Sequence, residues 1–309
     1  MYEATDKLLT LEDLKSAQDI VTRSKLNVRR TPCILLRNEG GRCCSLFSEN
    51  QNFNSDNWGQ IWIKCENFQT TGSFKIRGLA SQIEAFKKFC EFNAKNEVSM
   101  VTMSAGNYGR SFAFGAQQLG LSATVLMPDT APDNREAIMN SFGAQVERMP
   151  SKDLLNGVKK HEGLGKIFLH PFDDINLIAG HGSLGLEILE DVPDVDIIVL
   201  CCGGGGLLAG VAAAIKLNKP SCKVFGVEPE TANTMQRSLL EGSPVTMPSS
   251  RSIAAGLAPP FAGQNAFRFF LFQILVQKVT NIPSTVALFK FCDFRRRELI
   301  LSAGGSRKI

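Results

Sequence analysis

Short apolar runs rich in β-branched residues alternate along the chain with longer amphipathic stretches. We expect strands at Ile61–Ile63, Ser99–Thr102, Ala123–Met127, Ile167–Leu169, Ile197–Leu200 and Val224–Val227. We expect helices at Ile76–Cys90, Tyr108–Leu119, Asp133–Phe142, Leu184–Leu189 and Leu207–Leu217. Strands separated by helices are typical of crossover connections, so this pattern predicts an α/β fold with a mostly parallel sheet.

The chain contains neither a linker rich in proline, glycine and serine nor an internal repeat. A second domain would therefore be inserted within the first. Residues 96–172 carry three of the expected strands and could close as a small sheet of their own. We expect a small inserted domain at 96–172 and a large domain made of residues 1–95 and 173–309.

Composition and charge narrow the function classes. With 309 residues, 44% of them hydrophobic, the chain can bury a large core. Its 34 basic and 30 acidic residues give a net charge of +4 without long runs of one sign, which does not suggest a nucleic-acid partner. An enzyme-sized globular protein is the simplest interpretation.

The cysteines and the apolar runs give information on the cellular location of the protein. The nine cysteines are odd in number and include no Cys-x-x-Cys pair, which favours a reducing environment over a disulfide framework. Residues Met1 to Asp6 lack the basic start of a signal peptide, and the run from Phe269 to Val276 is too short to span a bilayer. We expect a cytoplasmic protein without a membrane partner.

Lys75 is the first candidate for chemistry. It follows Thr70-Thr71-Gly72-Ser73-Phe74, a turn between an expected strand and an expected helix. Gly72 permits a tight turn, Ser73 can cap a helix, and Phe74 offers a flat apolar face to a ring. Such a lysine could simply extend its amine to water. With its flanking residues it favours an amine nucleophile that forms a Schiff base.

Two glycine-bearing loops have the same position between a strand and a helix. Gly203-Gly204-Gly205-Gly206 leads straight into a strong helix former, so its amides and the helix dipole would face an anion. It lacks the lysine of a nucleotide triphosphate loop, and a small phosphate fits better. A flexible hairpin is the alternative. The loop Ser104-Ala105-Gly106-Asn107-Tyr108-Gly109 could equally be an ordinary asparagine cap.

The three histidines are weaker candidates. His161, His170 and His181 have no zinc-site spacing with the cysteines. We expect each of them to be structural.

Four motifs in order resemble the fold-type-II pyridoxal phosphate enzymes, which include serine/threonine dehydratases and serine racemase. They are Thr70 to Gly78, Ser104 to Gly109, His170-Pro171-Phe172-Asp173-Asp174 with Ile178 to Ser183, and Gly203 to Gly210. The resemblance runs from about Ile20 to Gly263. It implies a doubly wound, mostly parallel sheet like that of the tryptophan synthase beta chain, with a smaller inserted α/β domain, and a homodimer.

The resemblance also implies a role for each matching residue. Lys75 resembles the Schiff-base lysine, Phe74 the residue that packs on the cofactor ring, and Asn107 the partner of its 3-hydroxyl. The phosphate cradle corresponds to Gly203, Gly204, Gly205 and Gly206 with the amide of Leu207. The loop that grips the substrate carboxylate corresponds to Ser104, Ala105, Gly106, Asn107 and Tyr108.

The activity implied by the resemblance is that of a pyridoxal phosphate-dependent dehydratase, or ammonia-lyase. It would convert L-threonine and/or L-serine to a 2-oxo acid and ammonia, with Lys75 taking the α-proton. Racemases of the family carry a serine hydroxyl at the position of Ala105, and a methyl group cannot carry a proton. Phe172 also resembles dehydratases. These two residues favour elimination, and serine racemase is the alternative.

Two expectations concern the end of the resemblance. A divalent cation (Mg or Mn) would use Glu228 and the carbonyl of Ala232, although Thr234 replaces the later acid of the family's site. Past Gly263 the match fades, and Ser302-Ala303-Gly304-Gly305-Ser306 replaces the segment that relatives carry. The chain ends at Ile309 before the loop that contacts the pyridine nitrogen, which leaves a truncated, weakly active or inactive cofactor-binding homologue as a second alternative.

Overall fold

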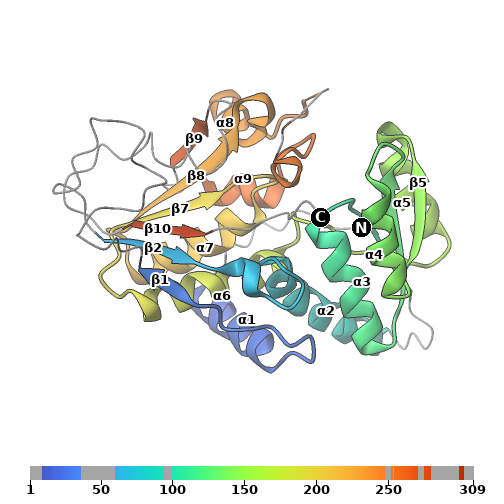
Figure 1. Ribbon diagram of the computed structural model, residues 1–309, viewed down its shortest axis with the longest axis horizontal. Helices are drawn as coiled ribbons and strands as arrows, with labels where there is room; N and C mark the ends of the chain where they lie inside the picture. Colours follow the sequence, from blue (N-terminus) through green and yellow to red (C-terminus); the bar gives the residue numbers. More distant parts are fainter. Residues whose placement is uncertain are drawn as a thin grey trace.

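The computed structural model describes residues 9–35, 60–93, 99–247, 252, 254–270, 275–279 and 299–302. Two sheets organise these residues, and Figure 1 shows them at opposite ends of the molecule. None of the described helices is long and apolar enough to cross a membrane.

The larger sheet has six strands in the order β1-β2-β10-β7-β8-β9. Their bounds are β1 Cys33–Leu35, β2 Ile61–Lys64, β7 Ile197–Cys201, β8 Lys223–Pro229, β9 Leu275–Val279 and β10 Leu299–Ser302. All neighbouring pairs are parallel except β1 with β2. The expected α/β class with a mostly parallel sheet is confirmed.

The smaller sheet is wholly parallel, in the order β5-β4-β3-β6. It consists of β3 Ser99–Met103, β4 Ser122–Pro128, β5 Gln145–Met149 and β6 Ile167–Phe168, with α3 Asn107–Leu119, α4 Asp133–Ser141 and α5 Leu154–Gly163 between them. All these elements lie within 96–172, as the inserted domain would require, and the domain boundaries themselves stay a prediction. We did not anticipate β5, whose edge position leaves its side chains partly exposed and its sequence without an apolar run.

Helices cover the larger sheet. They are α1 Leu11–Arg23, α2 Lys75–Phe92, α6 Ile175–Asp191, α7 Gly206–Asn218, α8 Thr234–Glu241 and α9 Gln264–Phe270, with single turns η3 Glu66–Phe68, η5 Glu230–Ala232 and η6 Ala255–Leu257. A further turn, η4 Ser151–Asp153, directly precedes α5. Of α6, the sequence predicted only the second half, at Leu184–Leu189. The helix starts earlier because the Asp174 carboxylate accepts a hydrogen bond from the Leu177 amide at 2.9 Å, which caps its first turn.

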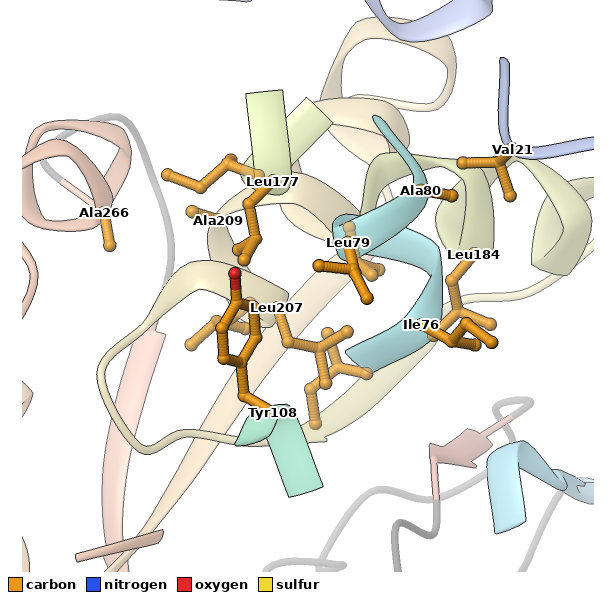
Figure 2. Close-up of a cluster of buried hydrophobic side chains, with 14 of the residues drawn as sticks. Val21, Ile76, Leu79, Ala80, Tyr108, Leu177, Leu184, Leu207, Ala209 and Ala266 are labelled. Carbon is orange, nitrogen blue, oxygen red and sulfur yellow. The ribbon is translucent and has the colours of Figure 1, made fainter. Parts of the chain in front are cut away.

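The main core lies where α2, α6 and α7 meet. Figure 2 shows Ile76 and Leu79 of α2, Leu184 of α6 and Leu207 of α7 in one buried cluster. Tyr108, at the start of α3, belongs to the same cluster. The core therefore connects the helix that begins at Lys75 with the helix that follows the four glycines.

A buried ionic network fixes the first turn of α2. The Arg77 guanidinium donates to the Glu66 carboxylate at 2.8 and 2.9 Å and to the Glu187 carboxylate at 2.7 and 2.9 Å. Lys64 pairs with Glu187 at 3.0 Å, and Arg77, Lys64 and Glu66 are all fully buried. Each buried charge thus has an opposite charge in contact, which its burial requires.

Candidate active site

Lys75 lies at the first residue of α2, after a turn in which Gly72 adopts a φ of 75°. Its amine donates to the Pro171 carbonyl at 2.9 Å and lies 5.4 Å from the centroid of the Phe74 ring. Burial lowers the pKa of this amine to about 8, and the Cys201 thiol nearby acts weakly in the other direction. A lowered pKa gives the amine the neutral fraction that a nucleophile or base needs near neutral pH.

The four glycines form a tightly packed loop at the start of α7. Gly205 has a φ of 96° and precedes the helix without any side-chain cap. A β-carbon on Gly204 would overlap the Phe172 ring, and one on Gly206 would overlap the Phe172 carbonyl oxygen. Glycine is therefore required by close packing and by backbone conformation, and the uncapped amides of the first turn suit an anion.

Gly204→Ala is expected to lower the free energy of unfolding by about 1–3 kcal/mol, because the added methyl group must displace the Phe172 ring. Urea unfolding followed by circular dichroism measures this loss. Gly163→Ala is the matched control, since a β-carbon there meets nothing within 4 Å. Equal stability of the two variants would contradict the proposed fit of Phe172 against the loop.

The Asn107 loop is held by its own neighbours. The Ser104 hydroxyl accepts hydrogen bonds from the amides of Gly106 at 3.3 Å and Gly109 at 3.1 Å, and Arg135 donates to the Ala105 carbonyl at 2.8 Å. Within the described ranges the Asn107 side chain makes no hydrogen bond. The Ser104 side chain therefore builds the loop, and the Asn107 amide group can meet a ligand.

The hydrogen bond of the Tyr108 hydroxyl was not predicted from the sequence. Tyr108 is 2% exposed and donates its hydroxyl to the Gln82 side chain at 2.5 Å. Its ring lies 5.8 Å from the Lys75 amine. The Tyr108 side chain thus forms part of the wall around Lys75.

The segment from His170 to Asp174 also borders Lys75. The His170 Nδ1 atom accepts from the Asp173 amide at 2.9 Å, and burial lowers the pKa of the ring to about 3, with a further contribution from Lys75. The Asp173 carboxylate accepts from the amides of Gln264 at 2.8 Å and Asn265 at 2.9 Å, which caps α9. His170 thus stabilises its own loop, and no sequence signal marked the Pro171 carbonyl as the lysine's partner.

The structure does not support the cation site expected at Glu228 and Ala232. The Glu228 carboxylate accepts from the amides of Met235 at 2.9 Å and Gln236 at 2.8 Å, and so caps α8. Burial raises the pKa of Glu228 to about 7. Among the described residues, no three histidine, cysteine, aspartate or glutamate side chains are grouped so that they could hold a metal ion.

The register of β10 bears on the pyridine-nitrogen contact, for which the sequence offered no candidate. β10 lies between β2 and β7 and is parallel to both, with Ser302 opposite Lys64. Ser302 is thus at the carboxyl end of the sheet, where β7 leads into the four glycines. The segment that follows it, 303–309, lies outside the described residues.

Comparisons with known proteins agree with this geometry. Residues 26–292 match the family model described as pyridoxal-phosphate dependent enzyme. An L-threonine ammonia-lyase of Geobacter sulfurreducens is 36% identical over 250 residues, which are 80% of this chain and 60% of that protein. A serine racemase of Schizosaccharomyces pombe is 32% identical over 228 residues, which are 72% of this chain and 67% of that protein.

Solved structures share the fold. The crystal structure of a T.th. threonine deaminase matches with a TM-score of 0.80 at 27% identity, over 97% of this chain and 99% of that one. The chain spans 60% of the length of the first curated relatives.

A buried amine of lowered pKa beside an uncapped, glycine-lined helix start is a site that fits an aldehyde cofactor with a phosphate group. The family model also covers most of the sequence. The chain belongs to the family of pyridoxal-phosphate dependent enzymes.

Proposed function

We propose that this protein is a dehydratase, or ammonia-lyase, that converts L-threonine and/or L-serine to a 2-oxo acid and ammonia. The observation that carries the proposal is the Lys75 amine, held at 2.9 Å from the Pro171 carbonyl with a pKa lowered to about 8. The similarity to an L-threonine ammonia-lyase supports the reaction class.

The site residues would divide the work as follows. Lys75 would hold the cofactor and would take the α-proton of the substrate, and the cofactor would supply an electron sink for the charge that remains. Phe74 would lie against the cofactor ring, and Asn107 would meet its 3-hydroxyl. The amides of Gly203, Gly204, Gly205, Gly206 and Leu207 would hold the phosphate.

Substrate binding falls to the loop from Ser104 to Tyr108. Its amides at the start of α3 would grip the carboxylate, because helix N-termini favour negative charge. Ala105 contributes only a methyl group, so the face opposite Lys75 has no acid or base at this position. Elimination is therefore favoured over racemisation.

The test is a substrate panel with the cofactor-loaded protein. Oxo-acid release is measured from L-serine, D-serine, L-threonine and 3-hydroxyaspartate, and D-serine formation is followed by chiral chromatography. We expect pyruvate from L-serine or 2-oxobutanoate from L-threonine. D-serine formation as fast as oxo-acid release would favour a racemase, and no turnover with a borohydride-stable adduct on Lys75 would indicate a passive cofactor-binding homologue.

Ala105→Ser is the matched variant for this panel. The added hydroxyl places a proton carrier at the position where racemases have one. We expect D-serine formation to rise relative to oxo-acid release.

Three further properties complete the proposal. A homodimer follows from the resemblance to the family and is checked by light scattering. A cytoplasmic location follows from the cysteine pattern. Residues 96–172 would form a small domain that moves relative to the rest, and the separate sheet of β3 to β6 supports this division.

A further inference from the structure

Gln82 and Lys75 share one face of α2. They are seven positions apart, about two turns of an α-helix, so their side chains point in nearly the same direction. Gln82 is 1% exposed. A buried amide must find partners for both its oxygen and its nitrogen, because an unpaired one is costly.

Both the oxygen and the nitrogen of the Gln82 side chain form hydrogen bonds to residues around Lys75. Its Nε2 donates to the His170 carbonyl at 3.1 Å, and its Oε1 accepts from the Tyr108 hydroxyl at 2.5 Å. Lys75 Nζ donates to the Pro171 carbonyl, the next one along the chain. Two consecutive carbonyls of one loop are therefore bound by the same face of α2.

The two partners of Gln82 come from segments that are far apart in the sequence. Tyr108 is in the first turn of α3, directly after Asn107, and its ring lies 5.8 Å from Lys75 Nζ. His170 belongs to the segment between β6 and α6. Gln82 is thus a bridge between the loop that we assign to the substrate and the loop that holds the lysine.

We propose that Gln82 is a positioning residue for Lys75, which fixes the Tyr108 ring and the Pro171 carbonyl at their distances from the amine. When Lys75 leaves the Pro171 carbonyl to bind a ligand, the Gln82 bond to His170 keeps that loop in place. The amine can then return to the same acceptor. This inference rests on the role proposed for Lys75.

Three variants test the two hydrogen bonds of the Gln82 side chain separately. Gln82→Glu keeps an acceptor for the Tyr108 hydroxyl and loses the amide donor to the His170 carbonyl. Tyr108→Phe removes the bond to Tyr108 and keeps the donor to His170. Gln82→Leu removes both bonds. Ser81→Ala is the matched control, since Ser81 is a buried neighbour on α2 that packs against Gly180 of α6.

The first readout uses the cofactor-free protein. The pH dependence of Lys75 acylation, mapped by mass spectrometry, gives the pKa of the amine. We expect it to rise in Gln82→Leu, because a loosened wall admits water, and to stay unchanged in Ser81→Ala; the charge of Gln82→Glu would raise it by itself, so that variant is not used for this readout. His170, His181 and Cys201, the other titratable groups coupled to the amine, are the same in Gln82→Leu and Ser81→Ala, whereas Gln82→Glu adds a carboxyl group and Tyr108→Phe removes a phenol.

The second readout is turnover in the cofactor-loaded protein. We expect kcat to fall about tenfold or more in Gln82→Leu with a smaller change in KM, and the effects of Gln82→Leu and Tyr108→Phe to be non-additive in the double variant. If the variants lose only stability, with the pKa of Lys75 and kcat as in Ser81→Ala, the inference is wrong. A shifted pKa in a protein without any turnover would support the inference and refute the proposed function.

Discussion

Replacement of Lys75 by alanine is expected to lower oxo-acid release from L-serine and L-threonine by at least ~10³-fold, because the same amine would bind the cofactor and take the α-proton. Its surroundings prepare it for both tasks. The amine is buried beside the Phe74 ring, its pKa is lowered to about 8, and the Pro171 carbonyl orients it. Turnover at saturating substrate measures the loss, and borohydride reduction followed by peptide mapping locates the adduct.

Lys75→Arg is the control for charge. It restores a cation at the position but offers no neutral amine, because a guanidinium stays protonated in proteins. Both variants should be equally inactive. Full activity of Lys75→Ala, or a borohydride adduct on another lysine, would contradict the assignment.

Lys75 should also make the stability of the cofactor-free protein depend on pH. Burial lowers the pKa of the Lys75 amine from 10.5 to about 8, so between these values the folded protein binds fewer protons than the unfolded chain. The free energy of unfolding should therefore rise as the pH increases from about 8 to 10.5. Lys75→Met should be more stable than the natural chain below pH 8, and this advantage should disappear above the window. Urea unfolding at several pH values tests the sign.

Local sequence was sufficient for the features that depend on neighbours along the chain. The strand from Ile197, the glycines that follow it and the helix from Gly206 form one continuous unit, and its pattern predicts its structure. Ser104 and Asp174 likewise act within a few residues of their own position. The strand, the glycines and the helix that follows them were expected, whereas the Asp174 cap, although local, was not, and α6 begins earlier than predicted.

The missed features depend on contacts between distant segments. The Lys75 amine meets a carbonyl 96 positions away, and the Gln82 side chain meets one 88 positions away. A backbone carbonyl has no residue type, so nothing in the letters marks it as a partner. Glu228 shows the opposite error, because a carboxylate that resembled a metal ligand is used to cap α8.

Arg77 provides the second large effect. Arg77→Ala is expected to lower the free energy of unfolding by ~3–5 kcal/mol, since it leaves the Glu66 and Glu187 carboxylates without their bidentate partner inside the protein. Glu66 is fully buried. Of the two carboxylates, the Lys64 amine pairs only with that of Glu187. Urea unfolding of the cofactor-free protein at neutral pH measures the change.

Arg30→Ala is the matched control. Arg30 also pairs with two carboxylates, those of Glu190 and Asp191, but its side chain is 52% exposed, and the loss should stay within about 1 kcal/mol. Arg77→Lys should fall between the two, because an ammonium group keeps the charge and loses the paired geometry. Similar losses in Arg77→Ala and Arg30→Ala would mean that water reaches the Arg77 network. In that case Arg77 could not hold the first turn of α2, and the position of Lys75 would depend on Gln82 and the core packing of Ile76 and Leu79 alone.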